Sequence, residues 1–313
     1  MISLKNTQDQ FHSGALKKPE YIAKMYEMHH THLFDYAKYM TSTDIKSIQI
    51  SDGKVIMTSK KYGVDMLCPE GDHRVAPIES LNFGSYEEDD SNMIMTLMPE
   101  KGIFFDIGAN MGWYSLLSAY KSKDLQIHAF EPIPKTYSFL EKNIELNNLE
   151  NIIPYNFGFS NESKNLEFYF YPEGSGNASS ANLSEREDAE IMLCHVERMD
   201  DFVHKNDLHV DFIKCDVEGA ELLVFQGGIH TVESEKPIVF TEILRKWTAK
   251  FKYNPNEIFD FFRKNGYSAF TAKGIGLFEF GAMDESTIET NFFFLHAEKH
   301  KNIIDMYTGD MRR

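Results

Sequence analysis

The sequence is poor in cysteine, in long apolar runs and in positive charge, and each shortage excludes a class of protein. Its three cysteines, Cys68, Cys194 and Cys215, are far apart and form no C-x-x-C pair. We therefore expect neither a disulfide scaffold nor a zinc site, as in a reducing compartment. No run of about 18 apolar residues occurs, and the first residues, MISLKNTQDQF, lack the apolar core of a signal peptide. These features predict a cytoplasmic chain without a transmembrane segment.

Positive charge is scarce, because 32 Lys and Arg residues face 48 Asp and Glu residues, for a formal net charge of -16. Proteins that bind nucleic acid neutralise phosphates with a basic surface, so we expect no DNA or RNA partner. What the chain does have is apolar material: 42% of its 313 residues, including 25 Phe and 15 Tyr. This is enough for a packed core, so we expect a folded chain.

The pattern of the chain changes near residue 95. Residues 1–95 predict a small α+β addition with a helix over residues 21–40. Its expected strands are 45–50, 54–59 and 64–68. This part carries no chemical motif, and we expect an accessory segment that joins two copies of the chain in a homo-oligomer or covers the acceptor side of a site. Residues 96–313 alternate strands with helices, which predicts one α/β domain with a mostly parallel sheet and helices on its faces.

Within the second part, the apolar runs predict strands at 103–107, 126–130, 152–157, 211–215 and 237–243. Helices are predicted at 112–120, 135–147, 220–226 and 256–265. The last strands have no helix between them, so they should pair antiparallel at the sheet edge; they are 267–271, 276–280 and 291–296. An additional strand at 166–171 precedes a segment rich in Gly, Ser and Asn, 172–190, which we interpret as a loop and a candidate lid.

The sharpest local motif is FFDIGANMGWYS at residues 104–115. An apolar strand runs into Asp106, then through Gly108, Asn110 and Gly112 into a helix. Glycine is needed where a backbone turns tightly and a ligand approaches it closely, and a helix N-terminus offers unpaired N–H groups. In an open parallel sheet such a turn lies at the carboxyl ends of the strands, where ligands bind.

The acid that follows the next strand, Glu131 in HAFEP, lies nineteen residues beyond Gly112. An acid in this place can accept hydrogen bonds from both ribose hydroxyls of a nucleotide. The glycine spacing differs from the G-x-G-x-x-G of dinucleotide sites, and Asp106 would repel a pyrophosphate. The ammonium and sulfonium groups of S-adenosylmethionine suit a carboxylate, so we predict this cofactor, with an NAD-dependent oxidoreductase as the alternative.

A second acidic motif, DFIKCDVEGAE, occupies residues 211–221, and Glu242 ends the strand PIVFTEI. Carboxylates crowded at strand ends are costly unless something cationic binds there. We predict that Asp216, Glu218 and Glu242 are catalytic: Asp216 near the transferred methyl group, and Glu218 and Glu242 orienting an acceptor hydroxyl and taking its proton. An alternative role for these three residues is to bind a divalent cation such as Mg²⁺ or Ca²⁺. Glu221 is expected to be a solvated helix residue.

Together these residues resemble the FkbM-type methyltransferase family. The motifs that carry the resemblance are Gly84-Ser85-Tyr86-Glu87, DIGANMGWYS, Phe130-Glu131-Pro132, the block at 216–221, and Glu242. The resemblance covers residues 84–245 and does not extend to residues 1–80.

The resemblance implies a class I methyltransferase (Rossmann-like) fold: a mostly parallel seven-stranded sheet with an antiparallel last strand. It implies O-methylation from S-adenosylmethionine, of a sugar hydroxyl in a glycan or glycosylated metabolite; a non-sugar small molecule is the alternative acceptor. The cofactor's amino-acid end would lie near Tyr86, Glu87, Asp106 and Asn110. Gly108, Ala109 and Gly112 would form the turn beneath it, Asp216 would lie near the methyl group, Glu131 would bind the ribose, and Phe157 or its neighbours would hold the adenine.

The sequence allows two other interpretations. His29, His30 and His32 in MHHTH could suggest a metal, but only His29 and His32 share a helix face and no acid completes the set, so we expect a surface helix. A non-catalytic scaffold on the same fold would not need Asp106, Glu131, Asp216 and Glu242 together. We therefore expect an enzyme.

Overall fold

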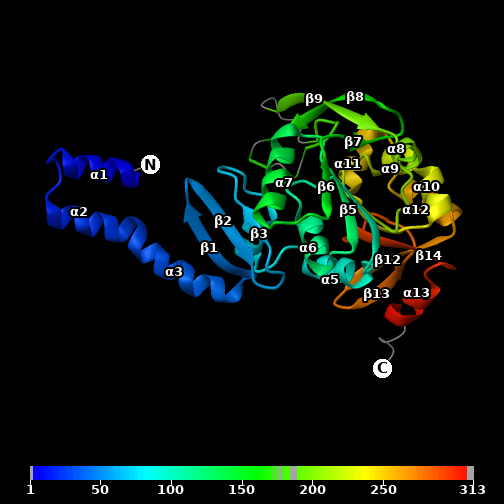
Figure 1. The fold of residues 1–313 in the computed structure, drawn as a ribbon, viewed down its shortest axis with the longest axis horizontal. Helices are drawn as coiled ribbons and strands as arrows, with labels where there is room; N and C mark the ends of the chain where they lie inside the picture. The colour runs from blue at the N-terminus through cyan, green and yellow to red at the C-terminus, as the bar shows by residue number, and fades with distance from the viewer. Residues whose placement is uncertain (1–2, 172, 175, 177, 184–188, 309–313) are drawn as a thin grey trace.

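The computed structural model describes residues 3–171, 173–174, 176, 178–183 and 189–308. The predicted loop at 172–190 thus lies in part outside the described residues. Figure 1 shows a compact body and, at one side of it, an N-terminal arm of helices. Among the helices that the structure describes, none is long and apolar enough to cross a membrane.

The body is built on an eight-stranded sheet with the order β13-β12-β14-β11-β10-β4-β5-β6. The strands are β4 (Gly102–Ile107), β5 (Leu125–Phe130), β6 (Ile152–Tyr155), β10 (Phe212–Cys215), β11 (Ile238–Glu242), β12 (Tyr267–Lys273), β13 (Gly276–Phe280) and β14 (Asn291–His296). Strands β6, β5, β4, β10 and β11 pair parallel. β14, β12 and β13 then follow through antiparallel pairs. The predicted class I fold is confirmed; the sheet has one strand more than the seven that the resemblance implies, because β13, predicted at 276–280, pairs with β12 at the edge.

Helices cover both faces of this sheet. They are α5 (Glu88–Leu97), α6 (Trp113–Lys121), α7 (Pro134–Leu146), α8 (Met199–Asn206), α9 (Glu221–Gly227), α10 (Ile229–Glu235), α11 (Arg245–Thr248), α12 (Asn256–Lys264) and α13 (Lys301–Thr308), with the short turn η4 (Ala249–Phe251). Because successive strand residues point to opposite faces, Phe104 and Phe105 belong to two different apolar cores. α5, α6 and α7 pack on the core of Phe104, and α8, α9 and α12 on the core of Phe105.

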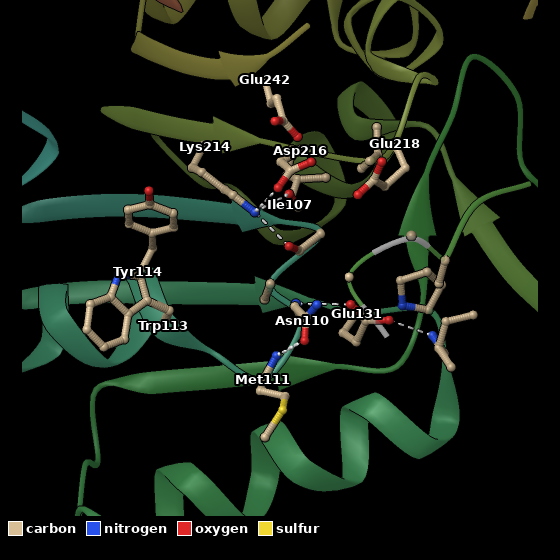
Figure 2. Close-up of a pocket in the computed structure, with 18 of the residues that line it drawn as sticks. Ile107, Asn110, Met111, Trp113, Tyr114, Glu131, Lys214, Asp216, Glu218 and Glu242 are labelled. Atoms are coloured by element: carbon tan, nitrogen blue, oxygen red, sulfur yellow. Dashed lines mark hydrogen bonds and ion pairs between the residues drawn. The ribbon is translucent and has the colours of Figure 1, made fainter. Parts of the chain in front are cut away.

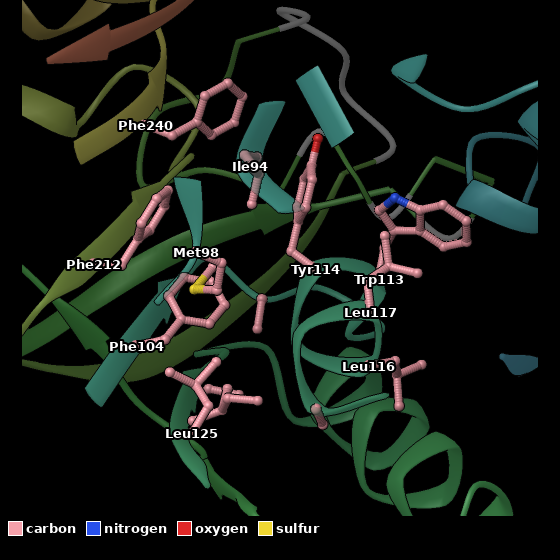
Figure 3. Close-up of a cluster of buried hydrophobic side chains, with 14 of the residues drawn as sticks. Ile94, Met98, Phe104, Trp113, Tyr114, Leu116, Leu117, Leu125, Phe212 and Phe240 are labelled. Atoms are coloured by element: carbon pink, nitrogen blue, oxygen red, sulfur yellow. The ribbon is translucent and has the colours of Figure 1, made fainter. Parts of the chain in front are cut away.

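The first core shows why these segments fold as they do (Figure 3). Ile94 and Met98, on and just after α5, and Leu116 and Leu117 of α6 meet Phe104, Phe212 and Phe240 from three neighbouring strands. Strands covered on both faces need near-continuous apolar runs. β10 is such a strand, except that it carries Lys214, which is buried.

Two small sheets complete the structure. The predicted strand at 166–171 is β8 (Lys164–Phe170), which joins β7 (Gly158–Phe159) and β9 (Glu190–Glu197) in the order β7-β9-β8. Near the N-terminus, β1 (Ile45–Ser51), β2 (Lys54–Ser59) and β3 (Asp65–Leu67) form an antiparallel sheet, followed by α4 (Ala76–Phe83). Strand β9 and helix α4 were not predicted from the sequence.

The predicted helix at 21–40 is interrupted. It consists of α2 (Lys18–Met25), a π-helical turn η1 (Tyr26–His30), α3 (Thr31–Tyr39) and η2 (Met40–Ser42), and α1 (Leu4–His12) folds back on α2. These helices project away from the body (Figure 1). Ile22, Tyr26, Leu33 and Phe34 are exposed on them. His30 and His32 are exposed too, in agreement with the surface helix expected there.

Candidate active site

A cavity of about 560 Å³ opens beside the carboxyl ends of β4, β5, β10 and β11. This volume is typical of small-molecule sites. Nine of the predicted site residues line it: Tyr86, Glu87, Gly108, Ala109, Asn110, Glu131, Asp216, Glu218 and Glu242. Asp106, Gly112 and Phe157 are not part of its wall. Three described residues of the 172–190 segment, Gly176, Ala178 and Ser180, also line the cavity.

The turn after β4 is shaped by positive φ angles. Gly108 has φ 71°, and a Cβ there would lie 1.8 Å from the backbone oxygen of Asp216. Only glycine can therefore occupy this place, where two strand ends meet. The N–H groups of Gly108 and Ala109 donate to the carbonyl of Phe130, so the turn is fixed to the end of β5. Gly112 lies behind the turn, where a Cβ would lie 2.6 Å from Leu140 Cδ1. Its role is close packing of helix α6.

Glu131 stands at the end of β5 and is buried. Its Oε2 accepts from the Asn110 N–H at 3.0 Å and its Oε1 from the Ile133 N–H at 2.9 Å (Figure 2). Burial raises the pKa of Glu131 to about 7, although both backbone hydrogen bonds act in the opposite direction. Each carboxylate oxygen keeps a second lone pair, so Glu131 can still accept from ribose hydroxyls in the cavity.

Asp106 and Asp216 are joined by a residue that sequence reasoning missed, Lys214. Its Nζ lies 3.6 Å from Asp106 Oδ1 and 3.7 Å from Asp216 Oδ2, and it donates to the Gly108 carbonyl at 2.6 Å. Ser115 Oγ donates to the other oxygen of Asp106 at 2.6 Å. Burial alone would lower the pKa of Lys214, but attraction to Asp216 and Asp106 outweighs it and the pKa is raised. Asp106 thus lies behind the cavity wall and fixes Lys214.

The sequence did contain a signal for Lys214. A lysine within the apolar run FIKC is expensive to bury without a partner, and the parallel register places Lys214 directly beside Asp106. The electrostatic argument that assigned Asp106 to a cationic ligand therefore applies first to Lys214.

Glu87 forms the wall beside this group. It begins helix α5 with a left-handed φ of 43°, and Tyr114 donates its hydroxyl hydrogen to the Glu87 carboxylate. Burial raises the pKa of Glu87 to about 7, against the effect of the Tyr114 hydrogen bond. Tyr86 packs its ring edge-on against Trp113, whose indole N–H donates to Ser91 Oγ at 3.2 Å. A half-buried carboxylate with an aromatic neighbour suits the ammonium end of a cofactor.

Three further carboxylates line the cavity at the ends of β10 and β11, close enough to Glu87 for their charges to interact. One carboxylate oxygen each from Asp216, Glu218 and Glu242 lies within 4.8 Å of the other two. Figure 2 shows the three side chains converging from the ends of two strands and the turn between them. Two unit charges 4.8 Å apart repel by roughly 3 kcal/mol at an effective dielectric constant of about 20. Burial and then the charge of Asp216 raise the pKa of both Glu218 and Glu242 well above the usual range.

Glu221 was expected to be solvated, and this expectation is wrong. Its side chain is buried, and its Oε1 accepts from the N–H groups of Val217 at 3.1 Å and Gly219 at 3.0 Å. The helix-start position of Glu221 allows its carboxylate to cap the turn that precedes it. Tyr253 donates to the Gly219 carbonyl at 2.8 Å. Glu221 therefore holds the turn that presents Asp216 and Glu218.

For the adenine, the resemblance implied Phe157 or its neighbours. Phe157 packs among Phe130, Phe159 and Phe202. Its neighbours Gly158, Phe159 and Ser160 line the cavity instead, together with Ile133. The alternation of side chains along an extended segment turns Phe157 to one side and its neighbour to the other.

Sequence reasoning also missed Trp247 and Lys246 after β11. Both line the cavity. The Nε1 of Trp247 is buried and has no hydrogen-bond partner among the described residues, and the Lys246 ammonium lies 4.0 Å from the centre of the Trp247 ring. No local motif identifies them from the sequence, because a tryptophan after a strand is a packing residue as often as a ligand-binding one.

Comparison with known proteins places these features in one family. The family model described as "Methyltransferase FkbM domain" matches residues 106–269, just over half of the chain. Methyltransferase 1 of Beauveria bassiana is 31% identical over 147 residues, which are 41% of this chain and 59% of that protein. The hexuronic acid methyltransferase AglP of Haloferax volcanii is 25% identical over 149 residues, covering 47% of this chain and 59% of that protein.

These matches span about three fifths of the length of each of the two curated relatives. Among solved structures, an FkbM methyltransferase from Methylobacillus flagellatus aligns with a TM-score of 0.39 and 15% identity, over 62% of this chain and 44% of that chain. A methyltransferase from Agrobacterium tumefaciens aligns with a TM-score of 0.41 and 11% identity, over 79% of this chain and 70% of that one.

Proposed function

Since the chain belongs to the FkbM methyltransferase family, we propose that it transfers a methyl group from S-adenosylmethionine to a hydroxyl of a sugar, in a glycan or glycosylated metabolite. The observation that carries the proposal is the division of one cavity. A glycine turn and Glu131 line one end, and the carboxylates of Glu218 and Glu242 line the other. Such a cavity can hold a nucleoside and an acceptor side by side.

The cofactor end fits S-adenosylmethionine better than a dinucleotide. Gly108 leaves room that any Cβ would fill, and Glu131 is placed for the ribose. Lys214, the ammonium beside the turn, is already engaged by Asp106 and Asp216. A pyrophosphate would therefore meet carboxylates without a free cation from Lys214, whereas a ligand with a positive amino-acid end would meet Glu87.

At the acceptor end, Glu218 and Glu242 would orient the hydroxyl and accept its proton. When bound, S-adenosylmethionine supplies a methyl group on a positively charged sulfur that leaves as a neutral thioether. A carboxylate with a raised pKa is a stronger base than an ordinary one, and general-base help contributes about 10²–10⁴-fold. Alignment of the acceptor oxygen with the methyl carbon contributes further, and the rigid turn at residues 216–219 provides it.

A sugar is the acceptor class that the cavity wall supports best. Trp247 presents an unpaired N–H at the acceptor end, and an aromatic ring offers both an apolar surface and a donor to a polar ligand. The relative AglP is named a hexuronic acid methyltransferase. A non-sugar small molecule with a hydroxyl group is the alternative acceptor.

For residues 1–95 we propose an accessory role, apart from Tyr86 and Glu87, which line the cavity. The arm of α1, α2 and α3 exposes several large apolar side chains, including Ile22, Leu33 and Phe34. Exposed apolar surface of this kind is typical of interaction sites, and a second copy of the chain is the proposed partner. Sedimentation of the whole chain and of a Leu33→Ser, Phe34→Ser variant compares their oligomeric states; a monomeric parent chain would contradict the proposal.

The function is tested in two steps. Calorimetry should show binding of S-adenosylmethionine and none of NAD, and the binding should weaken in Glu131→Gln but not in Glu145→Gln, an exposed acid of α7. Transfer of labelled methyl to hexuronic acid-containing and neutral glycans then tests the acceptor class. Binding of NAD alone would contradict the proposed cofactor, and labelling of non-sugar hydroxyls only would contradict the proposed acceptor.

A further inference from the structure

We propose that Asp216, Glu218 and Glu242 form a binding site for one divalent cation of the Mg²⁺ or Mn²⁺ type, at the acceptor end of the cavity. The geometry is the first support. Asp216 directly follows β10, Glu218 lies in the turn after it and Glu242 ends β11, and one oxygen of each lies within 4.8 Å of the others. Two ligand oxygens about 2.1 Å from one Mg²⁺ lie at most about 4.2 Å apart, so a closing movement of a few tenths of an ångström would bring the three oxygens around one cation.

The second support is that two of the three residues have a buried carboxylate oxygen without a partner. Asp216 Oδ1 and Glu218 Oε2 accept no hydrogen bond from the residues that the structure describes. Lys214 approaches only the other oxygen of Asp216, Oδ2. Among the ion pairs of the described residues, none includes Glu218 or Glu242. Lys214 and Lys246 lie close enough to attract the Glu218 carboxylate, but neither forms an ion pair with it among the described residues.

The third support is that the protein holds the carboxylates in this crowded arrangement. Glu218 has a left-handed φ of 55°, which costs a non-glycine residue free energy. Glu221 binds the N–H groups on both sides of Glu218, and Ser179 Oγ donates to the Glu218 carbonyl at 2.9 Å. A turn built for packing alone would not direct a third carboxylate toward Asp216 and Glu242.

The ligand set decides the class of cation. All three ligands are carboxylates, and hard oxygen ligands without His or Cys favour Mg²⁺, Mn²⁺ or Ca²⁺ over zinc. Three protein ligands leave further positions for water or for an acceptor. Two adjacent oxygens of an acceptor, such as neighbouring sugar hydroxyls, can fill two of them, and a bound cation lowers the pKa of a coordinated hydroxyl. This role toward the acceptor rests on the proposed function, whereas the cation site itself does not.

The test is a titration of the whole chain with Mn²⁺, followed by the loss of the electron paramagnetic resonance signal of the free ion. We expect saturable binding of one Mn²⁺ per chain, at least about tenfold weaker in Glu242→Gln and in Glu218→Gln because ligand charge sets affinity. Both changes remove a repelling charge and should not unfold the chain, which circular dichroism checks. Glu79→Gln is the matched control, since Glu79 lines the same cavity but pairs with Arg74.

Mn²⁺ binding unchanged by Glu79→Gln and competed by Mg²⁺ would support the site. Absence of saturable binding, or equal weakening by Glu79→Gln and Glu242→Gln, would overturn it. Calorimetry with S-adenosylmethionine on the same samples separates the two proposals. Cofactor binding without Mn²⁺ binding contradicts the cation site alone, and Mn²⁺ binding without cofactor binding contradicts the proposed function alone.

Discussion

The two ends of the cavity use carboxylates in opposite ways. At the cofactor end, Glu131 accepts from two backbone N–H groups. Behind the wall, Asp106 Oδ2 accepts from Ser115, whereas Asp106 Oδ1 lies 3.6 Å from Lys214 Nζ and accepts no hydrogen bond from the described residues. At the acceptor end, Asp216 Oδ1 and Glu218 Oε2 likewise accept no hydrogen bond from the described residues, and no backbone N–H group donates to either oxygen as it does at Glu131. A satisfied carboxylate stabilises the fold and positions a ligand, whereas an unpartnered one costs free energy until a ligand arrives.

The hydrogen-bond partners of the carboxylates indicate which of them is available to a ligand. Both ends carry acids at strand ends, so the acids alone do not distinguish them. What distinguishes them is whether the chain itself provides the partner. Lys214 lies between the ends and forms ion pairs with Asp106 and Asp216; Figure 2 shows its side chain beside Asp216.

Removing Lys214 should break the division most severely. Lys214→Met leaves Asp106 and Asp216 without their buried cation, and loss of one partner of a buried ion pair costs about 3–5 kcal/mol. Urea unfolding should show this loss in the free energy of unfolding. The double variant Lys214→Met, Asp106→Asn should recover part of it, because one of the uncompensated charges is gone. Equal losses in both variants would contradict the pairing.

Changing the acceptor end should affect rate without affecting cofactor binding. Glu242→Gln keeps the shape of the side chain and removes its charge, so we expect the methyl-transfer rate to fall by about 10²-fold or more. The dissociation constant of S-adenosylmethionine should stay within about twofold, since no ribose contact is lost. Calorimetry and a labelled-methyl assay measure the two quantities. A large loss of cofactor affinity would mean that Glu242 also contributes to cofactor binding and would contradict the division of the cavity.

The complementary change at the cofactor end is Glu131→Gln. A hydrogen bond to a charged group contributes about 1.5–3 kcal/mol, so the dissociation constant of S-adenosylmethionine should rise by about tenfold or more. The backbone contact to Asn110 can be kept by the amide oxygen, which limits damage to the turn. Unchanged affinity would mean that the ribose binds elsewhere.

The pH dependence of cofactor binding tests whether Glu131 and Glu87 contact the cofactor. Burial raises the pKa of Glu131 and of Glu87 to about 7, so both are mostly neutral at about pH 6 and mostly charged at about pH 7.5, while an α-amino group stays protonated. Affinity for S-adenosylmethionine should rise severalfold across this window, with a shallower rise in Glu131→Gln. Calorimetry at several pH values measures the slope, and identical slopes would contradict the assignment.

The stability of the free protein depends on pH in the opposite direction from cofactor affinity. The pKa of both carboxyls is raised in the folded chain above the value of 4.5 in the unfolded chain. Their contribution to stability is therefore complete below about pH 4.5 and is lost as the pH rises through about 7.

The smallest expected effect concerns the turn beneath the acceptor end. Tyr253→Phe removes the hydrogen bond to the Gly219 carbonyl, which should cost about 1 kcal/mol of stability. Thermal unfolding checks this, with Tyr36→Phe on the exposed helix α3 as the control. A fall in the methyl-transfer rate larger than the fall in stability would show that the turn also aligns Glu218.

Much of the fold and part of the site could be predicted from the sequence. The strand-helix alternation predicted a mostly parallel sheet. The motifs at 104–115 and 211–221, with Glu131 after the intervening strand, predicted that Gly108, Glu131, Asp216 and Glu218 would come together, because parallel strand ends share one edge. Lys214, Trp247 and the burial of Glu221 were not predicted. Each depends on which side chain faces which across neighbouring elements, and periodicity along one segment does not report this.

Two predicted site residues, Asp106 and Phe157, are absent from the cavity wall for a similar reason. Asp106 was assigned to the ligand because it is an acid at a strand end, but its carboxylate points to Lys214 on the next strand. The resemblance implied that Phe157 or its neighbours hold the adenine; Phe157 packs on Phe130 and Phe159, and its neighbours Gly158 and Phe159 line the cavity. In both cases the type of residue can be read from the sequence, but the direction in which its side chain points cannot.

The division of the cavity is tested most directly by a structure of the chain with S-adenosylhomocysteine bound. We predict that the ribose hydroxyls donate to Glu131, the amino group lies near Glu87, and the sulfur faces Asp216, with Glu218 and Glu242 left open to the acceptor. An adenosyl group bound against Glu218 and Glu242, with Glu131 free of the ribose, would contradict the account.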